Sequence, residues 1–284
     1  VLAHIVASRM RHFKDAVWKE NVTKVVQEIR GKNIKFIKLQ FTDVNGILKS
    51  LSVHSKNIES ILENGQSFDG SSITGFRPIE ESDMVLYPDP STFAEIPWRP
   101  HEKASGRMIC DVYTPEDRRF EGDPRYVLER ALKKCEDAGM KFVCAPELEF
   151  FLLKESEDGK VPKPIDMAGY FDYHPGDLTD WIRREIADMA ECFGIEIEIA
   201  HHEVALGQNE IDFKFDEALE TADRTITMKM VTKIVAAKNG YLATYMPKPF
   251  YGVNGSGMHV HQSMWNLDRT ENLFYSDDPS SNFL

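Results

Sequence analysis

Hydrophobic and polar positions in the first part of the chain recur with two different periods. Apolar residues from Val22 to Ile29 follow helical spacing, which predicts a helix over residues 17–30 that ends at Gly31. Strands are predicted where apolar and polar residues alternate or apolar residues cluster: 35–41, 48–53, 83–87 and 107–112. The sequence DVNG at 43–46 is typical of a hairpin turn. Residues 17–115 are therefore expected to form a small sheet with one helix.

The second part of the chain alternates strands with longer helices. The polar segment 115–123 is the expected domain boundary, and Asp123 followed by Pro124 indicates a helix start. Helical periodicity predicts helices over 124–138, 178–193 and 216–239, and a strand is predicted over 142–153. The strands of this part carry polar side chains on one face, which favours an open sheet around a site over a fully buried parallel sheet.

Composition and charge exclude several classes of protein. A formal net charge of −12 disfavours nucleic acid as a partner. No apolar run is long enough to span a bilayer, so no membrane association is expected. The four cysteines are widely separated (Cys110, Cys135, Cys144 and Cys192), which indicates reduced thiols and a cytoplasmic location. Residues 1–16 lack the apolar core of a signal peptide and are interpreted as a leader or tag-like segment.

Carboxylates spaced two residues apart on strands are the main chemical signal. Glu147 and Glu149 fall on one strand face, and like charges in such a row resist ionising together unless a cation lies between them. Oxygen-rich clusters with few imidazoles favour Mg²⁺ or Mn²⁺ over zinc. Enough ligands for two such ions are present: Glu147, Glu149, Glu203, Glu210 and His259. Neither a Walker-type nor a Rossmann-type glycine motif occurs, so the nucleotide sites of those folds are not supported.

Each of these motifs alone also has an ordinary structural interpretation. A strand with two glutamates is typical of a solvated face, His259 and His261 fit a strand edge, and Asp69 fits a turn. No role is assigned to His201 or His202. The metal hypothesis is favoured because three separate stretches with strand-like alternation carry candidate ligands and are bounded by prolines or glycines. They are 146–151, 195–203 (with 210–215 following) and 254–263.

Four motifs in order resemble the prokaryotic type I glutamine synthetase family. They are FDGSSITGF with ESDMVLYPD, then PELEFF, then HHEVALGQNEID, and finally MPKPFYGVNGSGMHVHQS. The resemblance implies an α+β fold: a β-grasp-like domain over 17–115, then the first part of a larger α/β catalytic domain over 123–284 with a curved, mostly antiparallel sheet. It also implies ATP-dependent ligation of ammonia to the γ-carboxylate of L-glutamate through γ-glutamyl phosphate.

The resemblance further implies roles for individual residues. Glu149, Glu203 and Glu210 match the ligands of one Mg²⁺ or Mn²⁺, and Glu147 and His259 match part of a second site. The positions that line ATP are Glu198, Phe215, His261 and Ser263. Glutamate is received by Asn254 and Gly255 beside Glu149, and His259 meets the transferred phosphoryl group. Ammonium is bound and deprotonated by Asp69 with Ser72, Tyr170 and Glu203. Asp69 reaches the site from a neighbouring subunit of a dodecamer of two six-membered rings.

Two departures from the family pattern leave alternatives open. The chain ends at Leu284, before the family's flap glutamate, its substrate-clamping arginines and the last ligand of the second metal. The loop between Glu203 and Glu210 is one residue shorter than in the adenylylated subgroup. It therefore resembles the alpha-like subgroup controlled by feedback inhibition or regulatory proteins. One alternative is a ligase that joins glutamate to a polyamine or ethanolamine, and another is a truncated, non-catalytic structural or regulatory relative.

Overall fold

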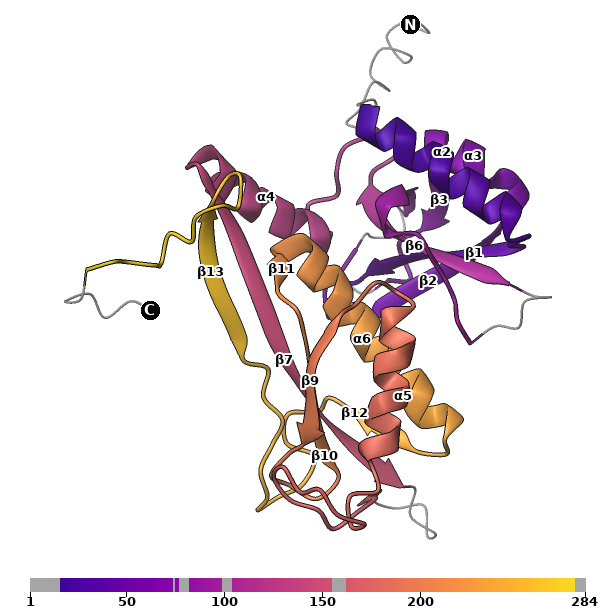
Figure 1. The fold of residues 1–284 in the computed structure, drawn as a ribbon. Coiled ribbons are helices and arrows are strands. Elements are labelled where there is room, and N and C mark those ends of the chain that lie inside the picture. The colour runs from indigo at the N-terminus through magenta and orange to yellow at the C-terminus, as the bar shows by residue number, and fades with distance from the viewer. Residues whose placement is uncertain (1–15, 74, 77–81, 99–103, 155–161, 279–284) are drawn as a thin grey trace, which may run out of the picture. The chain divides into compact units, whose positions relative to one another are not determined.

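The computed structural model describes residues 16–73, 75–76, 82–98, 104–154 and 162–278 (Figure 1). Its chain divides into two compact units, one up to Ala131 and the other from Leu132, and each is considered by itself. Residues 1–15, which include nearly all of the expected leader, lie outside the described part. Among the described helices, none has both the length and the apolar character that a membrane crossing requires.

The first unit is a mixed sheet with helices packed on one face. Its elements are α2 (Ala16–Gly31), β1 (Phe36–Thr42), β2 (Leu48–His54), η1 (Ser55–Asn57), α3 (Ile58–Asn64), β3 (Gln66–Asp69), β4 (Asp83–Pro88), η3 (Pro90–Thr92), β5 (Ala94–Glu95) and β6 (Ser105–Tyr113). The strand order is β2-β1-β6-β4-β3, and β5 also pairs with β6. The β1–β6 pair is parallel, whereas the other pairs described in this unit are antiparallel.

The core of this unit lies between the sheet and the two α-helices. Alternate residues of β1 are buried (Ile37, Leu39 and Phe41), and they join a cluster with apolar side chains of α2, α3, β4 and β6. Asp43 holds the predicted hairpin turn, since its Oδ1 accepts hydrogen bonds from the amides of Asn45 and Ile47. The sequence-based expectation of a single helix was wrong. Helix α3 buries Ile58, Ile61 and Leu62 but has only seven residues, too few for its period to stand out.

The second unit is an antiparallel sheet built on one long strand. Its elements are α4 (Pro124–Asp137, which begins in the first unit), β7 (Met140–Lys154), β8 (Lys163–Pro164), α5 (Asp180–Glu191), β9 (Ile197–His202), β10 (Gln208–Phe213), β11 (Asp216–Glu217), α6 (Ala218–Lys238), β12 (Leu242–Thr244) and β13 (Val260–Asn266). Strand β7 pairs antiparallel with β8, β10, β11, β12 and β13, and β10 pairs with β9.

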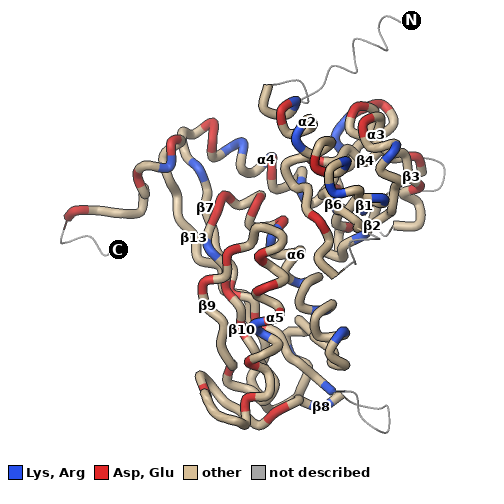
Figure 2. Tube along the Cα trace, turned by 45° about the vertical axis from the view of Figure 1, so that its right-hand side comes forward, with Lys and Arg blue, Asp and Glu red and all other residues tan. Residues whose placement is uncertain are grey.

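Helices α5 and α6 pack against each other and cover one face of this sheet (Figure 1). Phe150 of β7 points toward them and contacts Tyr245, whose hydroxyl donates a hydrogen bond to Thr232 of α6. Because strand side chains alternate, Glu147 and Glu149 point to the opposite face. Figure 2 shows acidic residues gathered along β7, β9 and β10. The helices therefore leave this acidic face of the sheet open.

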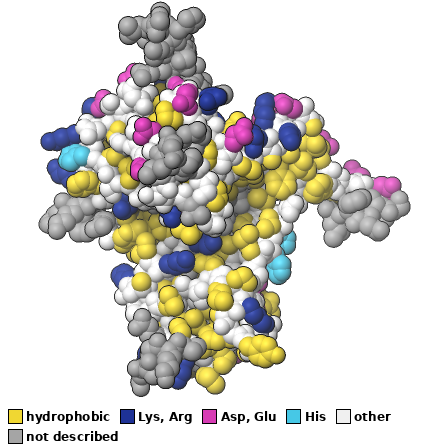
Figure 3. Space-filling model, turned by 180° about the vertical axis from the view of Figure 1, so that it is seen from behind, with side chains coloured by type: hydrophobic (Ala, Val, Ile, Leu, Met, Phe, Trp, Pro, Cys, Tyr) yellow, Lys and Arg dark blue, Asp and Glu magenta, His cyan; other side chains and the backbone are white. Residues whose placement is uncertain are grey.

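Large apolar side chains remain exposed toward the end of the described chain. Hydrophobic side chains are widespread on the face seen in Figure 3. The exposed apolar residues of the last segment include Met246, Tyr251, Met258, Leu267, Phe274 and Tyr275. Exposed apolar residues of this kind are common on protein surfaces.

Candidate active site

The acidic face is set by the register of β7 against β10. Glu149 lies opposite Glu210, and Glu147 lies opposite Asp212. Strand β9 continues the sheet, so that His201 lies opposite Glu210 on the other side of β10. Glu203 follows β9 directly, and its amide donates a hydrogen bond of 2.8 Å to the Gln208 carbonyl, which closes the β9–β10 turn. Polar side chains from β7, from β10 and from β9 with the residue after it therefore meet on one face.

Three glutamates form the centre of this face. Carboxylate oxygens of Glu149, Glu203 and Glu210 all lie within 4.8 Å of one another, and Glu149 and Glu210 are buried. Burial raises the pKa of Glu210, and the charges of Asp212, Glu203 and Glu149 raise it further. Carboxylates that repel one another in this way are stabilised when one of them is protonated or when a cation lies between them. The donor set is all oxygen, which fits Mg²⁺ or Mn²⁺.

Glu147 forms a second cluster with two histidines. His259 Nδ1 lies 2.9 Å from Glu147 Oε2, and His261 Nε2 lies 2.6 Å from Glu147 Oε1. The hydrogen bond from His261 is the largest cause that lowers the pKa of Glu147, and His259 adds to it. Both histidine rings are exposed, so their free nitrogens and the carboxylate are open to an incoming ligand. This set of one carboxylate and two imidazoles also fits a divalent cation.

His201 occupies a position that sequence reasoning did not recognise. Its ring packs edge-on against Phe171 and Tyr170, which are stacked on each other with centroids 4.0 Å apart. His201 Nε2 lies 3.8 Å from Glu210 Oε2, and the ring belongs with Glu210 and Asp212 to a second possible ligand group. Burial and the charges of Glu203 and Glu210 raise the pKa of Tyr170.

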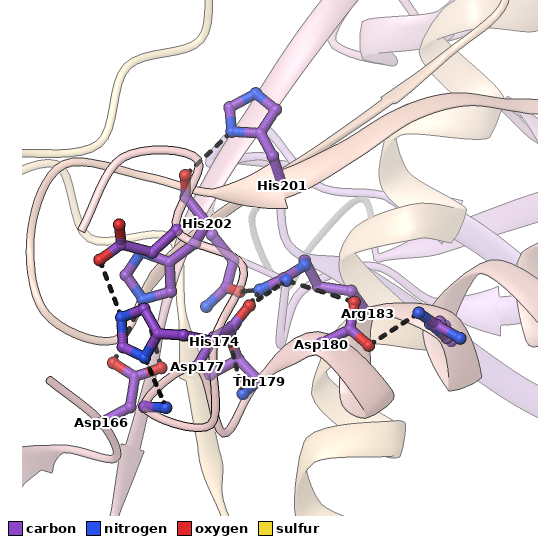
Figure 4. Close-up of polar contacts among 12 residues, drawn as sticks. Asp166, His174, Asp177, Thr179, Asp180, Arg183, His201 and His202 are labelled. Atoms are coloured by element: carbon purple, nitrogen blue, oxygen red, sulfur yellow. Dashed lines mark hydrogen bonds and ion pairs between the residues drawn. The ribbon is translucent and has the colours of Figure 1, made fainter. Parts of the chain in front are cut away.

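A buried polar network supports the site from the helix side of the sheet (Figure 4). His202 Nε2 lies 3.2 Å from both carboxylate oxygens of Asp166, and both side chains are fully buried. The guanidinium of Arg183 in α5 donates hydrogen bonds to Asp177 Oδ2 and Thr179 Oγ1, both at 2.5 Å. It also donates to the side-chain oxygen Oδ1 of Asn209 at 2.6 Å. His202 and Asn209 directly precede Glu203 and Glu210, so this network fixes the backbone from which two of the three glutamates project.

The other residues predicted for the site lie in several places. Ser263 lies on β13, where its Oγ accepts a hydrogen bond from Trp265 Nε1, and Phe215 is about half exposed between β10 and β11. Glu198 lies on β9 beside an irregularity in its register with β10. Burial and nearby carboxylates, with Glu198 among them, raise the pKa of Asp212 to about 6.

The loop that carries Asn254 and Gly255 joins this face through a hydrogen bond from Gln208 Nε2 to the Gly255 carbonyl, at 3.0 Å. Asp69 and Ser72 belong to the first unit. There the Asp69 carboxylate accepts hydrogen bonds from the amide and the hydroxyl of Ser71, which lower its pKa.

Two models of one protein family match this chain. The model described as "Glutamine synthetase, catalytic domain" matches residues 121–284, and the one described as "Glutamine synthetase, beta-Grasp domain" matches residues 33–115. The chain belongs to the glutamine synthetase family. The sequence-based assignment to this family and the α+β fold expected from it are confirmed.

Similar proteins are known in several organisms. Glutamine synthetases of Thermotoga maritima and Methanocaldococcus jannaschii are 50% and 51% identical over 262 and 257 residues, which cover 92% and 86% of this chain. These alignments cover 58% and 56% of the relatives, so the chain spans a little more than half the length of the curated glutamine synthetases it matches.

Two solved structures with the same fold each match about nine tenths of this chain. One is described as a GmaS/ADP complex, with a TM-score of 0.81 and 31% identity over 90% of this chain and 58% of that one. The other is Plasmodium falciparum glutamine synthetase, with a TM-score of 0.82 and 26% identity over 92% of this chain and 57% of that one.

Proposed function

We propose that the protein catalyses the ATP-dependent ligation of ammonia to the γ-carboxylate of L-glutamate through γ-glutamyl phosphate. The observation that carries the proposal is the convergence of Glu149, Glu203 and Glu210 within 4.8 Å. It is supported by the match of this same part of the chain to the catalytic-domain model of the family.

Two divalent cations, Mg²⁺ or Mn²⁺, are assigned to the acidic face. Glu149, Glu203 and Glu210 would hold one, and Glu147 with His259 would supply part of the other. Cations held there would neutralise the charge that develops on the transferred phosphoryl group. The sheet itself fixes the position of these charges, because Glu149 and Glu210 come from neighbouring strands and Glu203 directly follows β9.

The substrates are assigned to the two sides of the metal face. ATP is lined by Glu198, Phe215, His261 and Ser263. Glutamate is received by the backbone at Asn254 and Gly255 beside Glu149, with His259 facing the phosphoryl group. The hydrogen bond from Gln208 to the Gly255 carbonyl supports this assignment, since it ties the glutamate loop to the acidic face.

Ammonium is assigned to a pocket of Asp69, Ser72, Tyr170 and Glu203. An anionic pocket attracts the cation, and a carboxylate within it can take the proton that must leave before nitrogen acts as a nucleophile. In this proposal Asp69 comes from a neighbouring subunit of a dodecamer formed by two hexameric rings. Such head-to-tail contacts within a ring are the symmetry that lets one subunit complete the site of the next.

In this proposal the chain comprises a β-grasp domain over 17–115 and the first part of the catalytic domain over 123–284. The protein acts in the cytoplasm. Regulatory proteins are possible further partners of the alpha-like subgroup, to which the short loop before Glu210 assigns this chain.

The experiment that tests the function measures phosphate release and glutamine formation by the full-length protein with glutamate, ammonium, ATP and Mg²⁺. Glu210→Gln should abolish turnover, because one of the three central carboxylates is lost. Glu191→Gln is the matched control, since this exposed glutamate ends α5 away from the acidic face. Turnover with ethanolamine or a polyamine but not with ammonium would identify a γ-glutamyl-amine ligase instead. No turnover with any amine would favour the non-catalytic relative.

A further inference from the structure

Gln208 is a fully buried side chain at the first position of β10, and its amide contacts two parts of the candidate site. It is 0% exposed. Its Nε2 donates to Glu149 Oε2 at 2.9 Å and to the Gly255 carbonyl oxygen at 3.0 Å. Its Oε1 accepts a hydrogen bond from the Ala205 amide at 3.1 Å. A carboxamide has two N–H donors, and Glu149 and Gly255 are their nearest acceptors, with Ser256 Oγ at a longer 3.4 Å from the same nitrogen.

The partners of Gln208 determine which way its amide group points. A carboxylate and a carbonyl can only accept hydrogen bonds, so the nitrogen must face Glu149 and Gly255. The Ala205 amide can only donate, so the oxygen must face the β9–β10 turn. One side chain therefore joins the turn after Glu203, the Glu149 carboxylate and the glycine loop.

The glycine loop itself lies against the Glu149 carboxylate. A Cβ added to Gly257 would lie 3.1 Å from Glu149 Oε1, and one added to Gly255 would lie 2.3 Å from the Pro247 carbonyl oxygen. The Ser256 amide donates to that same Pro247 oxygen at 2.8 Å. Thus one oxygen of Glu149 is held by Gln208 and the other is covered by Gly257.

We propose that Gln208 is a positioning residue that couples cation binding at Glu149, Glu203 and Glu210 to the conformation of the loop at 254–257. This inference rests on the proposed function, since it takes the three glutamates as a cation site. A cation that draws Glu149 into one fixed position also fixes the Gln208 amide, and the second N–H of that amide then holds the Gly255 carbonyl. In the other direction, an ordered loop limits the positions open to the carboxylate. Partners that orient a metal ligand in this way typically change metal affinity by roughly 10- to 100-fold when they are removed.

The test compares the unaltered chain with Gln208→Met, in which a side chain of similar length cannot form hydrogen bonds. Mn²⁺ is the probe, and its affinity is measured by titration calorimetry. Hydrogen exchange of the backbone amides of residues 251–258 is followed with and without saturating Mn²⁺. Gln208→Asn is the second variant, because it keeps a buried amide but is one carbon too short to reach both acceptors.

The expected result has two parts. Both variants should bind Mn²⁺ about 10- to 100-fold more weakly, and saturating Mn²⁺ should slow exchange at 251–258 only in the unaltered chain. Asn209→Leu is the matched control: Asn209 is equally buried on the same strand, but contacts Arg183 and the Gly207 carbonyl on the opposite face. Its stability should fall, while its loop response to Mn²⁺ should persist.

Two results would overturn the proposal, and they are distinguishable. If the Gln208 variants bind Mn²⁺ as tightly as the unaltered chain and show the same slowing of exchange, Gln208 is only a packing residue. If the unaltered chain itself does not bind Mn²⁺, the cation site of the proposed function is wrong, and the inference falls with it.

Discussion

Glu149 and Glu210 lie directly opposite each other across the antiparallel pair of β7 and β10. Like charges in that position repel, and both side chains are buried, so neither is well solvated as an anion. A sheet without ligand therefore carries a destabilising pair at the point where the proposed cation binds. The same two carboxylates that would bind the cation therefore lower the stability of the cation-free sheet.

Glu210→Gln should stabilise the cation-free protein and remove its response to Mn²⁺. Without the cation, burial and the neighbouring carboxylates raise the pKa of Glu210 to about 8, so the folded state disfavours the ionised side chain that the unfolded chain carries at pH 7. Replacing it with a neutral amide should therefore raise the free energy of unfolding at pH 7 by roughly 1 kcal/mol or more. With Mn²⁺ at a hundred times its dissociation constant, the unaltered chain should gain about 2.7 kcal/mol, whereas the variant should gain almost nothing. Urea unfolding with and without Mn²⁺ measures both effects. A variant with an unchanged Mn²⁺ response would mean that the carboxylates are only a hydrated strand face.

His202→Leu should destabilise the protein by about 3 kcal/mol, because it leaves the buried Asp166 carboxylate without its imidazole partner. The matched control is His201→Leu, the same change one residue earlier on the opposite face, where the ring packs against Tyr170 and Phe171. That variant should lose less than about 1.5 kcal/mol. Chemical denaturation at pH 7 compares the two, and equal losses would contradict a supporting role for the His202–Asp166 pair.

Asp177 should give the protein an acid-sensitive contribution to stability. Burial acts to raise its pKa, but hydrogen bonds from Arg183 and Thr179 outweigh this and lower the pKa from 3.8 to about 2. The folded-state pKa is lower than the unfolded one, so the contribution is complete above about pH 4 and is lost as the pH falls toward 2. Its size is roughly 2 kcal/mol by linkage.

Asp177→Asn removes this contribution, so the difference in unfolding free energy between the unaltered chain and the variant should shrink steadily from pH 5 to pH 3. A difference that stays constant over this range would show that the Arg183–Asp177 pair does not depend on the charge of the carboxylate.

Gly255→Ala should displace the glycine loop, because its Cβ would lie 2.3 Å from a backbone oxygen that cannot rotate away. A loss of about 1–3 kcal/mol is expected from overpacking of this kind. In the full-length protein the KM for glutamate should rise as well. Gly31→Ala serves as the control: it lies at the end of α2 with nothing within 4 Å of the added Cβ and should be neutral or slightly stabilising. Equal behaviour of the two variants would argue against a tight loop.

The sequence predicted the elements better than it predicted the contacts between them. Alternation placed Glu147 and Glu149 on one strand face, because a period of two is visible in a strand fifteen residues long. The short helix α3 and strand β3 were missed, since each has too few residues to show a period. Asp69, the last residue of β3, had a turn as its ordinary structural interpretation for the same reason.

The supporting residues of the site could not be predicted, because their partners come from distant parts of the chain. His202 contacts Asp166, and Gln208 contacts both Glu149 and Gly255. Alternation shows which face a side chain takes, but not the register that brings Glu210 opposite Glu149. Gln208 differs from an ordinary polar residue because its buried amide lies between the Glu149 carboxylate and the Gly255 carbonyl, which is visible only once the strands are paired.

Strand β7 pairs with strands that follow it much later in the sequence, which matters during synthesis of the chain. Its site-bearing half pairs with β10, and its first half pairs with β13, which lies near the end of the described chain. Chains are translated from the N-terminus, so β7 leaves the ribosome well before either partner exists. Pairings between distant segments also form slowly. A nascent chain arrested before residue 259 would therefore lack both histidines that contact Glu147, and binding of a cation by both clusters would report that synthesis has reached β13.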